Sequence, residues 1–331
     1  MVALSLESKR ISARRVRDYT KAFCAFVSFC VLRGLRPPTE LGDEPKILSE
    51  NLGKFIEHLY AQRSSFTHAK YAVLSVQHKF RHLRRHLQGP WDKLTTWELE
   101  IPLNMRRPIP VILFWAVFAN AMMHGLSFPG NIGLDWLCFG VSWLCGYFGM
   151  MRPGEIFEAR GTMFLFPSMA TSKHRLLITV HHAKNQRYMG KSQVVVITNG
   201  TCVRWAKWLW QQLPHSALLV RGGRAKFTKL MEASLETLGV GRHFLGPACL
   251  RAGRATELFL EGVELSRLRV LGRWKSYSAL DHYVQQASSL LVENDINKQK
   301  LLDMHSLLKE TSFLRFPPAV SLAQLWSSAR R

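Results

Sequence analysis

Three residues near the carboxyl end of the sequence have the types and the spacing of a site that could break a phosphodiester bond. Arg251 is followed 23 residues later by Trp274, and Tyr283 lies nine residues beyond that tryptophan. A tyrosine hydroxyl can attack phosphorus and keep the bond energy in a phosphotyrosine linkage. Arginines can hold the phosphate oxygens, because a planar guanidinium presents paired donors that a lysine lacks. We expect Arg152, further upstream, to be the second such arginine.

The segments around these residues resemble the sequence boxes of the tyrosine recombinase family. Residues 149–156 (GMMRPGEI) are similar to the first box, in which an acid follows the arginine after three residues, as Glu155 follows Arg152. Residues 250–253 (LRAG) resemble the second box, and residues 272–274 (GRW) resemble the third. The boxes stand in the family's order, so together they identify the chain as similar to this family.

This resemblance implies a role for each matching residue. Tyr283 would be the nucleophile, and Trp274 would hydrogen-bond the scissile phosphate. Glu155 would brace the active site through hydrogen bonds without taking part in the chemistry. Lys184 matches the family's lysine, which is carried near the tip of a β-hairpin and is implied to be the general acid for the 5′ oxygen; Lys191 is the alternative.

One position departs from the family pattern. The second box usually has histidine three residues before its arginine, and this chain has Ala248 there. Alanine can neither donate nor accept a proton, and general acid–base catalysis contributes about a hundredfold or more. His243, five residues further upstream, is a candidate substitute. The alternatives are therefore an active enzyme that tolerates Ala248, or a decayed copy that binds DNA without cutting it.

Composition favours a polyanionic partner. The 331 residues include 45 Lys+Arg and 23 Asp+Glu, a formal net charge of +22. Nucleic acid is the leading candidate, ahead of a ribosomal or membrane surface. The hydrophobic content of 47% argues for packed cores and against disorder. The six cysteines form no C-x-x-C pair and no cluster of zinc-ligand spacing, so we expect free thiols and no metal site.

Two further features bear on localisation. No continuous apolar stretch precedes the first charged residues, so we expect no signal peptide and an intracellular protein, nuclear in a eukaryote and cytoplasmic in a bacterium or for a phage. Residues 132–151 approach the length of a membrane span, but they include Asp135 and four glycines. We expect a buried core helix there and no membrane partner.

The first third of the chain, residues 1–105, is expected to be helical, and the family resemblance implies that it is a SAM-like DNA-binding (core-binding) domain. Apolar residues at three- and four-residue steps predict helices at residues 12–32, 48–61 and 67–87, and prolines predict an extended linker at residues 102–110. The first and third helices carry basic residues that are candidate contacts to the DNA backbone. They are Arg14, Arg15, Arg17 and Lys21, and Lys79, Arg81, Arg84 and Arg85. A merely solvated basic face is the alternative.

The family resemblance implies that residues 106–295, which follow this domain, form the catalytic domain. Residues 176–182 and 193–198 are rich in Leu, Ile and Val and predict a β-hairpin with Lys184 near its tip, while residues 161–166 are a candidate third strand. Helical patterns flank this region on both sides. The expected fold class is therefore mainly α with a small antiparallel β-sheet.

Residues 296–331 are expected to form a carboxyl-terminal tail. Four leucines at helical spacing could dock on a neighbouring subunit: Leu301, Leu302, Leu307 and Leu308. The family resemblance implies a homo-tetramer on double-stranded DNA and no cofactor. Within the family, the Arg-Trp pairing of the third box is most similar to recombinases of eukaryotic mobile elements and some phages.

The resulting hypothesis is a site-specific DNA recombinase or integrase that acts through a 3′-phosphotyrosyl intermediate. A type IB topoisomerase uses the same residue set to relax supercoils and is the nearest enzymatic alternative. A DNA-binding relative whose catalysis has lapsed is the alternative from a different class, and a membrane-associated basic protein is the most remote.

Overall fold

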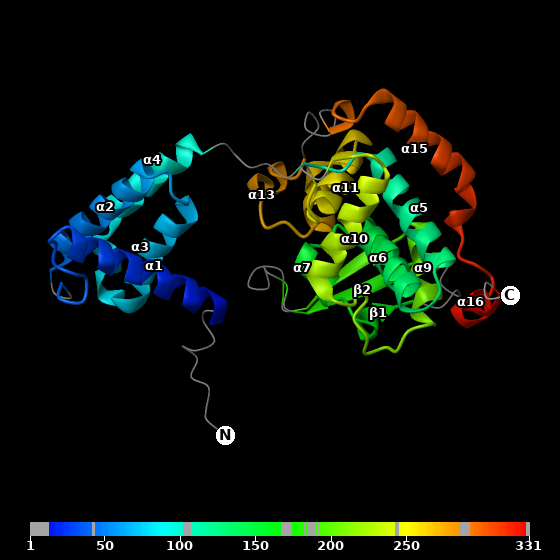
Figure 1. Cartoon of the computed structure of the whole chain (residues 1–331), viewed down its shortest axis with the longest axis horizontal. Helices are drawn as coiled ribbons and strands as arrows, with labels where there is room; N and C mark the ends of the chain where they lie inside the picture. The colour runs from blue at the N-terminus through cyan, green and yellow to red at the C-terminus, as the bar shows by residue number, and fades with distance from the viewer. Residues whose placement is uncertain are drawn as a thin grey trace, which may run out of the picture. The chain divides into compact units, whose positions relative to one another are not determined.

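The computed structural model describes residues 13–41, 44–101, 107–166, 174–181, 183, 190, 192–241, 245–284 and 292–328. The chain divides into two compact units, Met1–Asn104 and Met105–Arg331 (Figure 1). Each unit has its own cluster of buried apolar side chains.

The described part of the smaller unit is a helical bundle. It contains α1 (Ala13–Leu32), α2 (Pro45–Ala61), α3 (Phe66–Lys79), the short 3-10 helix η1 (Arg81–His86) and α4 (Gln88–Glu100). Aromatic rings hold the helices together: Phe26 and Phe29 of α1 lie 5.4 and 5.1 Å, centroid to centroid, from Phe55 of α2. Burial of such large apolar rings is the main stabilising contribution in a small unit.

The predicted length of the third helix, residues 67–87, is wrong, because the observed helix is shorter. Helix α3 ends at Lys79 because Phe80 leaves the helical conformation, with φ −117° and ψ 75°. The Phe80 ring packs 6.3 Å from the Phe23 ring of α1, and the 3-10 turn that follows buries Leu83 in the same core. Tertiary packing therefore overrides a continuous helical pattern here.

Long apolar helices form the core of the larger unit. They are α5 (Val111–Ser127) and α6 (Gly130–Phe148), with α9 (Gly200–Trp210), α10 (Gly223–Thr237) and α11 (Cys249–Leu260) packed around them. Helix α6 is apolar on almost every face and buried along most of its length, as the sequence predicted for residues 132–151. Among the described helices, none has both the length and the apolar character that a membrane span needs.

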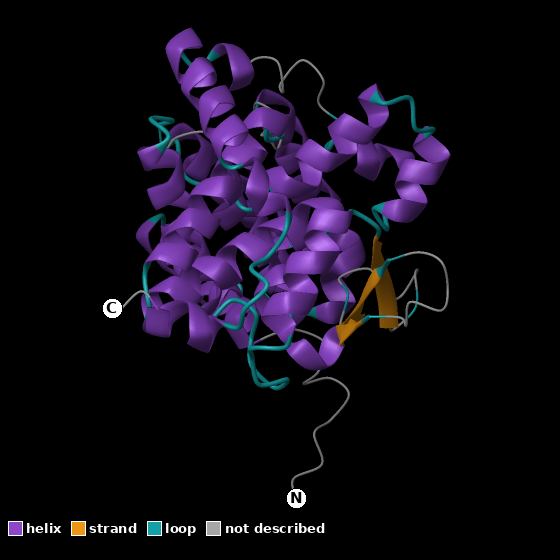
Figure 2. Cartoon of the chain, turned by 90° about the vertical axis from the view of Figure 1, so that its right-hand side faces the viewer, coloured by secondary structure: helices purple, strands orange, loops and turns teal. Residues whose placement is uncertain are grey.

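A small antiparallel sheet completes the larger unit. Its strands β1 (Phe164–Leu165), β2 (Leu176–His181) and β3 (Ser192–Ile197) are in the order β1-β2-β3, and Figure 2 shows them as one sheet among the helices. Leu176 pairs with Ile197 and His181 with Ser192. The predicted hairpin is confirmed to within a residue at the ends that the structure describes, and so is the mainly α fold class with a small antiparallel sheet.

The expected third strand, residues 161–166, is shorter than predicted. Residues Gly161–Met163 form the 3-10 turn η2, and only Phe164–Leu165 pair with β2. The reason is a competing partner: the amides of Gly161 and Thr162 donate to the carbonyls of Ala217 and His215 instead of to the sheet.

The carboxyl-terminal segment packs on its own unit. Helix α15 (Lys298–Glu310) lies along α5 (Figure 1), with Met304 buried and Leu302 51% exposed. Three of the four predicted leucines, 301, 307 and 308, pack against the core. Docking of this tail on a neighbouring subunit stays a prediction.

Helix α9 holds the chain that follows α15. Trp205 Nε1 donates to the Leu314 carbonyl of the 3-10 turn η3 (Ser312–Arg315) at 2.7 Å, and Arg204 Nη2 donates to the Arg315 carbonyl at 3.0 Å. Trp208 Nε1 donates to the Val320 carbonyl, at 3.2 Å, shortly before α16 (Leu322–Ser328). Side-chain donors on one helix therefore fix a segment that has little regular structure of its own.

We expect Trp205→Phe to loosen this segment, because it removes the donor to Leu314 and keeps most of the ring. A lost hydrogen bond that leaves a buried carbonyl unpaired costs about 1–3 kcal/mol. Amide hydrogen exchange in residues 311–320 should accelerate about tenfold or more, measured by mass spectrometry. Trp210→Phe on the same helix is the matched control and should leave that exchange unchanged. Equal exchange in both variants would contradict the assigned role of Trp205.

Candidate functional site

Arg152 stands at the start of a short helix that also carries its partner. Helix α7 (Pro153–Glu158) has proline at its first position, where the missing amide is not needed. Glu155 accepts from the Arg152 backbone amide at 2.9 Å and from its Nη1 at 2.7 Å. The Glu155 side chain is 8% exposed and that of Arg152 is 19% exposed. Glu155 follows Arg152 by three residues because its side chain caps the helix at the Arg152 amide.

Arg251 projects from α11 into the interior and is fully buried. Its Nη1 donates to the Met150 carbonyl at 2.9 Å and its Nη2 donates to the Gly272 carbonyl. Gly253 allows α11 to lie this deep, because a Cβ there would come within 2.7 Å of the Ile109 carbonyl oxygen. The small residue of the second box therefore has a direct packing role.

The Arg251 guanidinium is buried, and no carboxylate of the described residues pairs with it. Among the described residues it makes no ion pair, and its Nε has no hydrogen-bond partner. Burial, and then the nearby guanidinium of Arg152, lower the pKa of Arg251 from its ordinary value. A buried charge of this kind is costly to the protein alone and is stabilised when an anion binds beside it.

Trp274 and Tyr283 lie against this guanidinium. The Arg251 Cζ is 4.4 Å from the Trp274 ring centroid and 5.2 Å from the Tyr283 ring centroid, and the two rings are 5.1 Å apart. Trp274 is 3% exposed, and its buried Nε1 has no hydrogen-bond partner among the residues that the structure describes. The structure thus brings together the arginine, tryptophan and tyrosine that the sequence spacing singled out.

Two short helices position the tryptophan and the tyrosine. Helix α12 (Leu265–Leu271) ends just before the GRW segment, and α13 (Tyr277–Asp281) ends just before Tyr283. Ser276 caps α13 by accepting from the Ala279 amide at 3.2 Å. The Tyr283 carbonyl accepts from Thr256 Oγ1 of α11 at 3.1 Å. The nucleophile candidate is therefore tied to the helix that carries Arg251.

Arg273 is a site residue that the sequence analysis missed. Its side chain is 6% exposed, and its two terminal nitrogens donate to both carboxylate oxygens of Glu155, at 2.7 and 3.2 Å. Its carbonyl accepts from Arg152 Nη2 at 3.2 Å. Burial alone would raise the pKa of Glu155, but the Arg273 guanidinium, together with Arg152, holds that pKa below its ordinary value. The sequence signal was present in the third box, where an arginine separates the glycine from the tryptophan.

We use the name arginine cluster for Arg152, Arg251 and Arg273. Among the described residues, Glu155 pairs with Arg152 and Arg273, while Arg251 makes no ion pair, so the described part of the cluster carries more positive than negative charge. Such preorganised donors are suited to a phosphate group that gains negative charge during a reaction.

Several predicted site residues cannot be placed in this cluster. Lys184, Lys191 and His243 lie outside the described residues. The hairpin that carries Lys184 is described only as far as His181, Ala183, Gly190 and Ser192. Ala248 occupies the N-cap position of α11, and its side chain is only a methyl group. Among the described residues, no group of three His, Cys, Asp or Glu could hold a metal ion.

The predicted DNA-binding residues of the smaller unit are all exposed. Those on α1 are Arg14, Arg15, Arg17 and Lys21, and those at the end of α3 and in η1 are Lys79, Arg81, Arg84 and Arg85. Helices α1 and α3 are in contact, and Lys79 Nζ lies 4.3 Å from the centroid of the Phe23 ring of α1. The basic residue at the end of α3 is therefore anchored on the helix that carries the other basic set.

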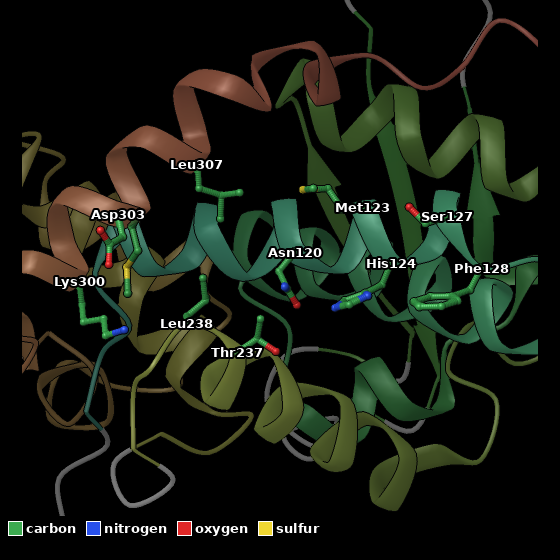
Figure 3. Close-up of a pocket in the computed structure, with 11 residues that line it drawn as sticks. Asn120, Met123, His124, Ser127, Phe128, Thr237, Leu238, Lys300, Asp303 and Leu307 are labelled. Atoms are coloured by element: carbon green, nitrogen blue, oxygen red, sulfur yellow. The ribbon is translucent and has the colours of Figure 1, made fainter.

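The larger unit also contains a pocket that is separate from the arginine cluster. It has a volume of about 480 Å³ and is lined by residues of α5, the end of α10 and α15 (Figure 3). Asn120 and His124 line it from α5, and Leu307 lines it from α15. Burial lowers the pKa of His124, which favours its neutral form. No residue of this pocket belongs to the arginine cluster or to the sequence boxes.

We expect Glu155→Gln to destabilise the larger unit at pH 7 by about 3 kcal/mol, because it leaves two largely buried guanidiniums without their carboxylate. The sign of the pH dependence follows from the lowered pKa of Glu155. Its stabilisation is complete above the ordinary glutamate pKa of about 4.3 and is lost as pH falls through the lower folded value. The difference from the wild type should therefore shrink in acid, as measured by urea unfolding.

Glu158→Gln, at an exposed position of the same helix, is the matched control. It should have little effect at either pH. A cost of Glu155→Gln that stays constant down to pH 3 would contradict the assigned ion pairs.

No protein-family model and no curated protein sequence matches this chain. It is similar to the crystal structure of XerA recombinase, with 15% identity over 90% of this chain and 92% of that chain and a TM-score of 0.41. It is also similar to XerH site-specific recombinase bound to difH substrate in a pre-cleavage complex, with 14% identity, coverage of 87% and 90% and a TM-score of 0.48.

A third similar structure is XerH bound to palindromic difH substrate in a post-cleavage complex. Its identity to this chain is 15%, the alignment covers 91% of this chain and 82% of that chain, and the TM-score is 0.54. The alignment includes residues of both units of the chain. At this level of identity the comparison concerns the fold, and on that evidence the chain has the tyrosine recombinase fold.

Proposed function

We propose that this chain cuts and rejoins double-stranded DNA as a site-specific recombinase. The observation that carries the proposal is the position of Arg251, a buried guanidinium with no ion pair among the described residues, over the rings of Trp274 and Tyr283. A nucleophile candidate beside an uncompensated cation is the arrangement that phosphoryl transfer to a side chain requires. The net charge of +22 also supports a nucleic-acid substrate.

In the proposed reaction, the Tyr283 hydroxyl gives its proton to a solvent water molecule, and its oxygen bonds to phosphorus as the bond from phosphorus to the 5′ oxygen breaks. The 5′ oxygen leaves with the bonding electrons and takes a proton from Lys184. Arg152 and Arg251 stabilise the charge on the non-bridging oxygens, and Trp274 Nε1 donates to one of them. Attack by a 5′ hydroxyl on the 3′-phosphotyrosyl bond then rejoins a strand and releases the tyrosine.

In our proposal, DNA binding, catalysis and assembly are carried out by different parts of the chain. Residues 1–105 bind the DNA backbone through the exposed basic residues of α1, α3 and η1. Residues 106–295 carry out catalysis, and residues 296–331 contribute to a homo-tetramer on DNA. We assign the chain to DNA integration by a mobile element, on the basis of the GRW segment of the third box.

A second candidate function is supported by one observation. Ala248 lies at the amino end of α11, the helix that carries Arg251, and has no group that could transfer a proton. A protein of this kind would bind duplex DNA with a steep salt dependence and would form no covalent bond to it.

We expect the wild-type protein to form a covalent adduct with a nicked duplex taken from the flanks of its encoding gene, because the nick lets the leaving strand diffuse away. Tyr283→Phe should abolish this adduct while it keeps the ring that packs on Trp274 and Arg251. The adduct is measured as a slow band on a denaturing gel. Tyr277→Phe, at an exposed tyrosine of α13, is the matched control and should keep the band.

The other outcomes separate the alternatives. A band that appears only after Ala248→His would identify the natural protein as a disabled recombinase. Binding without a band in either form would leave the DNA-binding function. Relaxation of supercoiled plasmids of any sequence would indicate a topoisomerase.

The tail's role in assembly can be tested at Leu302. Deleting α15 would uncover α5, whereas Leu302 is 51% exposed, so a change there leaves the fold intact. If α15 also contacts a neighbouring subunit, Leu302→Glu should lower the fraction of tetramer on DNA about tenfold and spare binding of a single site. Native gels of the complexes measure both. His305→Glu, exposed on the same helix, is the control, and an equal effect of both variants would contradict docking through Leu302.

A further inference from the structure

Arg273 occupies a backbone position that normally favours glycine. It follows the end of α12 with φ +59°, in the left-handed region, and its amide donates to the Val270 carbonyl at 3.0 Å. A helix that ends in this way usually has glycine at the left-handed position, because a side chain strains the backbone there. In this chain the glycine stands one residue earlier.

The structure gives a reason for this order. A Cβ at Gly272 would lie 1.6 Å from the Trp274 ring, so the glycine makes room for the tryptophan. The left-handed position then falls to Arg273. A strained residue that is retained at a site needs compensating contacts, and those of Arg273 are with Glu155.

These contacts close a ring of interactions. The Arg273 guanidinium binds both oxygens of Glu155, Glu155 accepts from Arg152, and Arg152 donates back to the Arg273 carbonyl. The neighbouring carbonyl of Gly272 accepts from Arg251. One turn of backbone therefore holds both arginines that the proposed function assigns to the phosphate.

We propose that Arg273 is a positioning residue for the cleavage reaction. Its guanidinium holds Glu155, and its left-handed backbone aims the carbonyls of Gly272 and Arg273 at the catalytic candidates Arg251 and Arg152. This inference rests on the proposed function, because it assigns no contact between Arg273 and DNA. A misplacement of about 1 Å at such a site can cost about a hundredfold in rate.

The informative variant is Arg273→Gly, because glycine keeps the left-handed backbone and loses only the guanidinium. We expect adduct formation on the nicked duplex to slow about 10- to 100-fold with unchanged DNA affinity. Free guanidinium ion, at concentrations far below those that unfold proteins, should restore part of the rate when equal sodium chloride does not. Arg273→Lys keeps the charge without paired donors and should give an intermediate rate.

Arg224→Ala, at an exposed position of α10, is the control for loss of one positive charge and should leave the rate unchanged. A second measurement does not need activity. The ¹⁵N guanidinium signal of Arg152, assigned by its loss in Arg152→Lys, should show faster rotation in Arg273→Gly than in the wild type.

The Arg152 signal decides the inference. If Arg152 is as immobile in Arg273→Gly as in the wild type, the positioning role is overturned, whatever the rate of adduct formation. If the wild type forms no adduct and Arg152 is mobilised by Arg273→Gly, the proposed function fails and the positioning role stands.

Discussion

The buried guanidinium of Arg251 is the constraint on which the rest of the candidate site depends. A charge inside a protein must be hydrogen-bonded, and Arg251 meets this need with two backbone carbonyls in place of a carboxylate. These carbonyls come from Met150, just before α7, and from Gly272, just after α12. Segments far apart in the sequence are thereby fixed around one side chain, and the positive charge stays available to an anion.

Glu155 balances the other two guanidiniums without reaching Arg251. It is paired with both Arg152 and Arg273, so its carboxylate is used fully within the cluster. A second carboxylate beside Arg251 would make the protein without bound anion more stable, and it would weaken phosphate binding. A cluster in which Glu155 pairs with only two of the three guanidiniums is therefore consistent with a site that binds an anion.

The aromatic side chains serve both packing and orientation. Trp274 contacts both the Arg251 guanidinium and the Tyr283 ring, and its size is accommodated by a glycine two residues earlier. Away from the site, tryptophans of α9 use their indole N–H groups to hold the carboxyl-terminal segment. In both places an indole group contributes a large apolar contact and one directional donor.

The candidate site residues and much of the fold class could be read from the amino-acid sequence. Arg152, Glu155, Arg251, Trp274 and Tyr283 were selected by their resemblance to the family's boxes, and the structure shows a helix cap and two short helices at these positions. The hairpin was also readable, since its strands are runs of β-branched and leucine residues.

Only the tertiary structure decided the remaining features. The break at Phe80 depends on the Phe23 ring of another helix, and the short third strand depends on carbonyls some fifty residues away. The place of Arg273 beside Trp274 was a signal in the sequence, but its pairing with Glu155, 118 residues distant, is visible only in the structure. Sequence periodicity indicates which local conformation is favoured. Where several local conformations have similar energies, long-range hydrogen bonds and ring contacts stabilise one of them.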